Sequence, residues 1–186
     1  MIHITLSDGS LREYDQPLSV YEFAASIGAG LAKAAVAGRV NGVLVDCEFM
    51  IEADARVNIV TPQEPDGLEI LRRSCALMLA VAIKQRYPKA QLQTGSVLGD
   101  GFFYEFAFER LLNLIDLAGI EARMRTLAAT NHQIRRRKPL AGSMPTDNSS
   151  PFLLGDFECL SVGPHVPATL VLQAFALDHI SGTTPQ

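Results

Sequence analysis

The chain has 186 residues, of which 48% are hydrophobic and 19% charged, and its net charge at neutral pH is −4. This length is sufficient for one large or two small domains with buried cores, and no apolar run approaches the roughly 18 residues that a membrane span needs. The acidic balance disfavours a nucleic-acid partner, because such proteins usually carry a basic patch. The N-terminus lacks the basic start and apolar centre of a signal peptide, so we expect a cytoplasmic protein with no membrane segment.

The first third of the chain has the pattern of a small strand–helix module. Residues 2–14 alternate apolar and polar side chains around a glycine turn, which predicts a hairpin. Ser19 and Glu22 have the spacing of a helix capping box. An Asn-Gly pair at 41–42, between valine-rich segments, predicts a second hairpin, and residues 55–60 predict a final strand.

The longest predicted element is a helix over residues 67–88, which a proline ends. Its apolar side chains follow three- and four-residue steps, which indicates one packed face. The pattern then predicts a strand over 104–109, a second helix over 111–133 and closing strands over 152–161 and 169–177.

A basic run at residues 134–138 is followed by residues 139–151, which lack periodicity and predict a loop. The basic run could contact nucleic-acid phosphates, but short charge runs are more often solvated helix ends. We predict that residues 183–186 form a frayed tail.

Several segments carry a family resemblance. In the first module these are residues 5–9 (TLSDG), 27–33 (IGAGLAK) and 37–42 (AGRVNG). They resemble the TGS domain that begins bacterial threonyl-tRNA synthetases.

Later segments resemble the editing domain that follows in those synthetases. They are residues 67–77 and 82–85 for its first helix, residues 94–105 for a later segment, and residues 163–167 (GPHVP) for its last motif. The resemblance implies an α+β fold, with a ubiquitin-like TGS module at residues 1–62. It implies a shortened editing-type domain at residues 63–186, with the long helix against an antiparallel sheet. Because the aminoacylation core and the anticodon-binding domain have no counterpart, we expect a stand-alone homologue that lacks part of the editing domain near residues 139–151.

The resemblance also implies where a site would lie. In the family, editing hydrolyses serine wrongly attached to threonine tRNA, with an HxxxH histidine pair on the first helix and a cysteine and a histidine in the last motif. The matching positions here are Arg73, Leu77, Ser161 and His165. Cys159 stands where the family has an acidic residue, and Tyr104 is retained.

These substitutions predict that the editing hydrolysis is lost. Arg73 is always charged and cannot serve as a neutral acceptor or base, and Leu77 offers only apolar surface. Ser161 without a neighbouring base would be a poor nucleophile.

Two functional hypotheses remain beside a decayed paralogue. The first is a pocket reused to bind and transform an amino-acid-like small molecule. Its substrate-binding residues would be Arg73, Leu77, Ser161 and Cys159, with Arg73 pairing bidentately with a carboxylate. A condensation or cyclisation at the amine, as in specialised metabolism, would use His165, Tyr104 and Glu158 as acid–base groups. The second hypothesis is a tRNA-binding module that edits in trans or regulates.

Each candidate residue also has a structural interpretation. Arg73 could be a solvated helix residue, and His165 could be held by backbone hydrogen bonds. Glu158 and Ser161 should face opposite sides of a short strand, so that only one points inward. Tyr104 could pack in the core, and Cys159 could be a small buried apolar residue.

No metal site or cofactor is predicted. The four histidines are scattered, the HxxxH pair is absent, and the three widely spaced cysteines fit neither a disulfide framework nor a zinc motif. Of the partners, an amino-acid-like molecule is favoured over tRNA, and a homo-oligomer is left open.

Overall fold

The computed structural model describes residues 1–137 and 149–182. Lys138, most of the predicted loop at 139–151 and the predicted tail at 183–186 lie outside these residues. Helices and antiparallel strands occur together, which confirms the α+β class. Across the described ranges, no helix is long and apolar enough to span a membrane.

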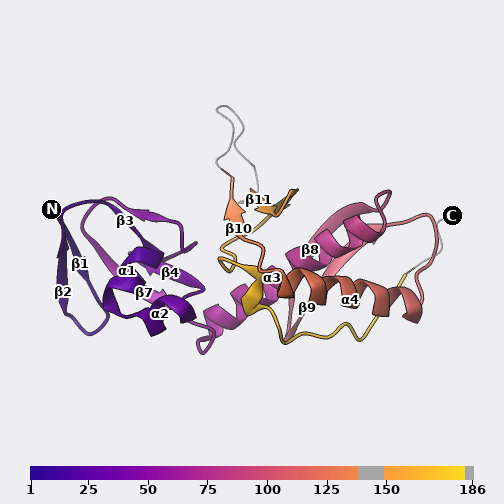
Figure 1. Ribbon diagram of the computed structural model, residues 1–186, viewed down its shortest axis with the longest axis horizontal. Coiled ribbons are helices and arrows are strands. Elements are labelled where there is room, and N and C mark those ends of the chain that lie inside the picture. Colours follow the sequence, from indigo (N-terminus) through magenta and orange to yellow (C-terminus); the bar gives the residue numbers. More distant parts are fainter. Residues whose placement is uncertain (138–148, 183–186) are drawn as a thin grey trace.

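The N-terminal part is a five-stranded sheet covered by two short helices (Figure 1). The strand order is β2-β1-β7-β4-β5, in which only the β1–β7 pairing is parallel. The sheet strands are β1 (Ile2–Thr5), β2 (Leu11–Tyr14), β4 (Ala37–Val40), β5 (Val43–Val45) and β7 (Ala55–Val60). Beside them lie the short pair β3 (Leu18–Ser19) and β6 (Met50–Ile51) and the helices α1 (Val20–Ile27) and α2 (Ala29–Ala34).

Local signals in this part are confirmed in detail. Ser19 accepts a hydrogen bond from the Glu22 amide while the Glu22 carboxylate accepts one from the Ser19 amide, so the capping box is formed. Asn41 and Gly42 adopt φ values of 49° and 87°, the left-handed pair that a tight hairpin turn requires. These features depend on neighbouring residues only, and the sequence pattern therefore predicts them well.

The long helix α3 (Pro65–Arg86) leads out of the N-terminal part and forms the axis of the second part (Figure 1). It begins two residues earlier than predicted, because Pro65 occupies the first turn, where a missing amide is tolerated. Gly67 is required there, since a Cβ at this position would lie 1.9 Å from the Thr61 carbonyl oxygen.

The prediction of one packed face on α3 is wrong for its second half. Every residue from Ser74 to Ile83 is buried. The reason is that this half packs against α4 (Leu114–Ala129) and against the hairpin of β8 (Gln91–Leu98) and β9 (Gly101–Ala107). The helix is therefore enclosed rather than half-exposed.

The remaining elements differ from the predicted closing strands. Residues 152–161 form a hairpin of β11 (Ser150–Leu154) and β12 (Phe157–Ser161), because Gly155 takes a positive φ of 59°. With β10 (Ile134–Arg136) they make a three-stranded sheet. The strand predicted over 169–177 is wrong. A single 3₁₀ turn at Thr169–Val171 replaces it, since the Thr169 hydroxyl donates to the Leu127 carbonyl oxygen and its amide to that of His132.

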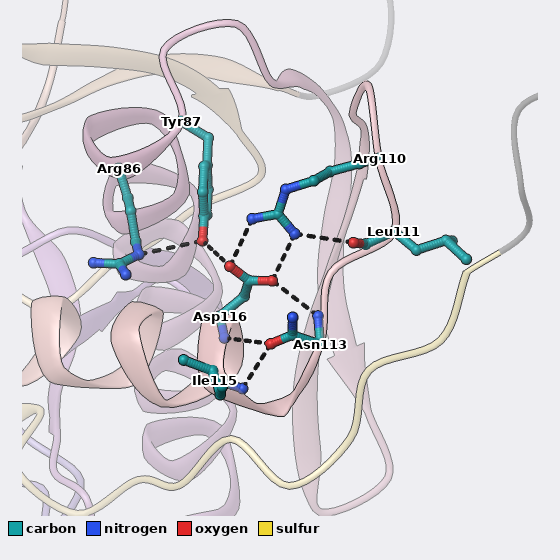
Figure 2. Close-up of polar contacts among 7 residues, drawn as sticks. All are labelled: Arg86, Tyr87, Arg110, Leu111, Asn113, Ile115 and Asp116. Atoms are coloured by element: carbon teal, nitrogen blue, oxygen red, sulfur yellow. Dashed lines mark hydrogen bonds and ion pairs between the residues drawn. The ribbon is translucent and has the colours of Figure 1, made fainter.

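The helix α4 is shorter than the predicted 111–133 because both ends are fixed by polar residues. Asn113 caps its start by accepting from the Ile115 and Asp116 amides, and Asn131 follows its end with a φ of 53°. Asp116 in the first turn accepts two hydrogen bonds of 2.8 Å from Arg110 and one of 2.8 Å from the Tyr87 hydroxyl. Figure 2 shows how these contacts converge on the Asp116 carboxylate. This network joins the start of α4 to the end of α3.

Candidate functional site

His165 lies at the centre of the region where the sequence predicts a site. The ring is 2% exposed and sits between α3 and the end of β12, after a cis peptide bond between Gly163 and Pro164. Its Nδ1 is 3.1 Å from the Ser74 hydroxyl, and its Nε2 is 2.9 Å from the Ser161 hydroxyl. Both ring nitrogens therefore have serine partners.

The hydrogen bonds of Ser74 define the tautomer of the His165 ring. The Ser74 hydroxyl donates to the Ile70 carbonyl oxygen at 2.8 Å and accepts from the Val166 amide at 3.0 Å. Since a hydroxyl has a single proton to donate, Nδ1 of His165 must donate to Ser74. Nε2 is then the acceptor for the Ser161 hydroxyl.

Electrostatics keep the His165 ring neutral. Burial lowers its pKa to about 3, and the positive charges of Arg73 and Arg136 act in the same direction. The Phe152 ring packs edge-on against the imidazole, with centroids 4.5 Å apart. The guanidinium of Arg136 lies 4.7 Å from the centroid of the same Phe152 ring. Protonating His165 would therefore place a charge in an apolar, already cationic environment.

Asp46, in the N-terminal part, contacts both His165 and Arg136. One of its carboxylate oxygens accepts from the His165 amide at 3.0 Å, and the other accepts from Nε of Arg136 at 2.7 Å. The Asp46 side chain is 17% exposed. A residue 119 positions away in the sequence thus helps to fix His165.

Ser161 has a neighbouring base, as a nucleophile would need, but that base is weak. The prediction that Ser161 lacks a neighbouring base is wrong, because Nε2 of His165 lies 2.9 Å from its hydroxyl. A base works best when its pKa lies near the working pH, and that of His165 is far lower. The pair is therefore better suited to hydrogen bonding than to activating a nucleophile.

The two predicted site residues on α3, Arg73 and Leu77, already contact other side chains of the protein. Arg73 forms an ion pair with Glu69 one turn earlier, and its side chain is 20% exposed. Leu77 is 3% exposed and belongs to the main hydrophobic core. Arg73 is close enough to depress the His165 pKa, whereas Leu77 supplies packing.

Tyr104 and Cys159 form a second contact beside this cluster. The Tyr104 hydroxyl lies 3.6 Å from the Cys159 sulfur. Burial, with Cys159 as a further cause, raises the pKa of Tyr104, and burial raises that of Cys159. Both groups stay protonated at neutral pH. The Tyr104 ring packs on Gly95 of β8, where an added Cβ would lie 2.3 Å from Tyr104 Cδ2.

Glu158 lies on the other side of β12 from Ser161, as the strand alternation predicts. Cys159 and Ser161 are half-buried, whereas Glu158 and Leu160 are exposed. The carboxylate of Glu158 pairs with Arg137. The structure therefore brings His165, Ser161 and Arg73 together, and leaves Glu158 apart from them.

The arginines of the predicted basic run have acidic partners. Arg135 pairs with Glu48 at 3.1 Å, Arg136 with Asp46 at 2.7 Å, and Arg137 with Glu158. These pairs leave little uncompensated positive charge on the described part of the run.

Sequence reasoning missed Asp46, Ser74, Arg136 and Phe152 as neighbours of His165. Ser74 carried a weak signal, as a lone hydroxyl within an apolar helical stretch. The other three come from distant segments that only the fold brings together. Two cavities, of about 420 and 280 Å³, lie away from His165. Within the described ranges, no group of three His, Cys, Asp or Glu side chains could hold a metal ion.

Comparison with known proteins identifies the class first. Residues 2–61 match the family model described as the TGS domain, so the chain contains a TGS domain. Over 199 aligned positions it is 41% identical to the threonine–tRNA ligase of Nitrosococcus oceani, covering 96% of this chain and 31% of that protein. It is 43% identical to the enzyme of Methylibium petroleiphilum over 202 positions, covering 98% of this chain and 32% of that protein.

The chain spans about a third of the length of the curated relatives that it matches. It is a homologue of the amino-terminal region of the threonine–tRNA ligases, also called threonyl-tRNA synthetases, and this confirms the resemblance found in the sequence.

Proposed function

We propose that this homologue has lost the editing hydrolysis and binds an amino-acid-derived small molecule at the surface between Arg73, Ser161 and Tyr104. The observation that carries the proposal is the state of His165, a buried imidazole with a pKa lowered to about 3. Hydrolysis of an ester needs a base able to take a proton from water near neutral pH. His165 is a poor candidate, and the family's other histidines are replaced by Arg73 and Leu77.

The ligand would bind through a carboxylate. Arg73 pairs with Glu69, whose side chain is 52% exposed. Such partly exposed pairs contribute little free energy, about 0.5 kcal/mol. A ligand carboxylate could therefore displace Glu69 and take both edges of the guanidinium. An ester to tRNA has no free carboxylate, so this interaction would favour a free amino acid.

The proposed transformation is a condensation or cyclisation at the amine of that ligand, in which the nitrogen bonds to a carbonyl carbon and the carbonyl oxygen leaves as water with the two amine protons. Tyr104 would serve as a hydrogen-bond donor, because its raised pKa keeps the hydroxyl protonated. His165 is assigned no proton transfer, because its pKa is lowered to about 3 and its Nε2 accepts from the Ser161 hydroxyl. Glu158 faces away and is assigned no step.

The alternative is a tRNA-binding module that edits in trans or regulates. Its electrostatic support is weak, because Arg135, Arg136 and Arg137 are each paired with an acidic side chain. Phosphate binding usually depends on unpaired cations and falls steeply with salt.

The test is calorimetric titration of the protein with L-threonine and L-serine and with their methyl esters. We expect saturable binding of a free acid, weakened about tenfold by Arg73→Ala, as for loss of a charge-assisted hydrogen bond. The esters should bind equally weakly to both forms. Arg72→Ala is the matched control, since Arg72 lies next on the same helix and pairs with the exposed Asp100.

Two results would overturn the proposal. One is hydrolysis of serine from threonine tRNA by the wild-type protein at a rate well above the uncatalysed one. The other is the lack of amino-acid binding that depends on Arg73, seen either as no binding at all or as an affinity that Arg73→Ala leaves unchanged. Salt-dependent binding of threonine tRNA in its place would support the alternative.

A further inference from the structure

The larger cavity lies away from the His165 cluster and shares no residue with it. It is half open to solvent, and its volume of about 420 Å³ lies within the roughly 300–1,000 Å³ of small-molecule sites. The end of α3, the second half of α4 and the tip of the β11–β12 hairpin contribute to its walls. Among the residues that line it are Arg123, His132 and Asp156.

The two charged side chains of this cavity, Arg123 and Asp156, are exposed and have no ion-pair partner among the described residues. Arg123 donates from Nε to the Gln85 side chain at 2.7 Å, which orients the guanidinium and leaves its terminal nitrogens without a partner among the described residues. The Asp156 carboxylate likewise has no ion pair or hydrogen bond within the described chain. By contrast, Arg125, two residues further along α4, is paired with Glu121. One cation and one anion thus line the same cavity and neither engages the protein's own charges.

Part of the lining is apolar. Leu127 and Leu154 are each 2% exposed and form part of the wall, together with the half-buried ring of Phe157. Apolar walls with a few unpaired polar groups are the usual composition of a small-molecule site.

The backbone around the cavity is fixed. His132 donates its amide to the Thr169 hydroxyl at 2.9 Å, and its carbonyl oxygen accepts from the Thr169 amide at 2.9 Å. Gly155 has a positive φ of 59°, and a Cβ there would lie 3.5 Å from Nδ1 of His132. The hairpin tip that carries Asp156 therefore lies against the anchored His132 segment.

We propose that this cavity binds a zwitterionic α-amino acid with an apolar side chain. Its carboxylate would take the terminal nitrogens of Arg123, its ammonium group would pair with Asp156, and its side chain would pack on Leu127, Leu154 and Phe157. This site is separate from the surface beside Arg73, and either can exist without the other.

The probe is L-leucine, titrated into the full chain. Binding is followed by calorimetry and by NMR of the methyl groups of the protein's own leucine residues. Two analogues each remove one charge: L-leucinamide lacks the carboxylate, and 4-methylpentanoate lacks the ammonium group. We expect leucine to bind about tenfold more tightly than either analogue and to shift the methyl resonances of Leu127 and Leu154.

Two variants assign each charge to its partner. Arg123→Gln should weaken leucine about tenfold and leave leucinamide unchanged, whereas Asp156→Asn should weaken leucine and leave 4-methylpentanoate unchanged. Arg72→Gln, which removes a cation outside the cavity, should change nothing. Equal melting temperatures confirm that the variants fold.

The proposal fails if leucine does not bind at millimolar concentration, if both analogues bind as well as leucine, or if Arg123→Gln retains full affinity. If Arg73→Ala abolishes leucine binding while Arg123→Gln does not, the ligand occupies the surface beside Arg73. That result overturns this site and leaves the proposed function standing.

Discussion

The His165 cluster and the cavity beside Arg123 are opposite kinds of polar site. At His165 the ring is buried, both nitrogens have serine partners, and the neighbouring Arg136 is paired with Asp46. At the cavity, Arg123 and Asp156 are without ion-pair partners in the described chain. Saturated buried groups hold a fold together, whereas unpaired groups in a cavity are available to a ligand. Of the two regions, the His165 cluster, which contains the motif of the family resemblance, therefore has the more structural role.

The largest expected effect comes from removing the imidazole. His165→Ala deletes a side chain that is 2% exposed and removes the partner of the Ser161 hydroxyl, whereas Ser74 keeps its hydrogen bonds to Ile70 and Val166. We expect a loss of about 3 kcal/mol in the free energy of unfolding, measured by denaturant titration. Arg123→Ala at the cavity should cost about 0.5 kcal/mol or less. Equal losses would contradict the contrast between the two regions.

Asp46 should have the next largest effect. Asp46→Ala leaves the His165 amide and Nε of Arg136 without their acceptor, and we expect a loss of about 2 kcal/mol. Glu48→Ala is the matched control, because its pair with Arg135 is more than half exposed and contributes about 0.5 kcal/mol. A loss no greater than that of the control would show that the two parts are not joined through Asp46.

Acid should destabilise the fold in two pH windows. The pKa of His165 is lowered from 6.5 to about 3, so the unfolded chain binds more protons in that interval and stability falls as pH drops through it. The two hydrogen bonds from Arg110 hold the pKa of Asp116 well below its usual range, so its contribution is complete above about pH 4 and declines below.

Unfolding free energies measured from pH 7 to pH 2.5 separate these windows. His165→Gln should flatten the slope above pH 4, and Asp116→Asn the slope below it. A wild-type stability that stays constant between pH 6.5 and 4 would contradict the assignment for His165.

The smallest effect is expected at Glu158. Glu158→Gln removes an exposed pair with Arg137 on the far side of β12. Stability should change by about 0.5 kcal/mol or less, and any ligand affinity at Arg73 should be unchanged. A tenfold loss of affinity would show that Glu158 contributes to ligand binding at Arg73.

The sequence predicted the local features well and the long-range ones poorly. The capping box at Ser19 and the turn at 41–42 depend on adjacent residues. Strand β8 was not predicted as an element, because Gln91–Leu98 mixes polar and apolar side chains without alternation. The strand predicted over 169–177 is absent, because Thr169 bonds to α4 and to the His132 segment instead.

The sequence selected residues that lie together in the fold, but it did not predict their protonation state. The resemblance selected Ser161 and His165, and the fold places them in contact. The neutral state of His165 depends on burial, to which the Phe152 ring contributes, and on the charges of Arg73 and Arg136, and these residues come from three other segments. No local pattern in the sequence could have joined them.

The central claim is that His165 is a neutral structural group, and ring NMR tests it most directly. In protein labelled with ¹⁵N at histidine, the ring should carry its proton on Nδ1. It should also remain neutral as the pH is lowered from 7 until the protein unfolds, consistent with a pKa lowered to about 3. A ring that titrates near pH 6.5 in the folded protein, or that carries its proton on Nε2, would contradict the account.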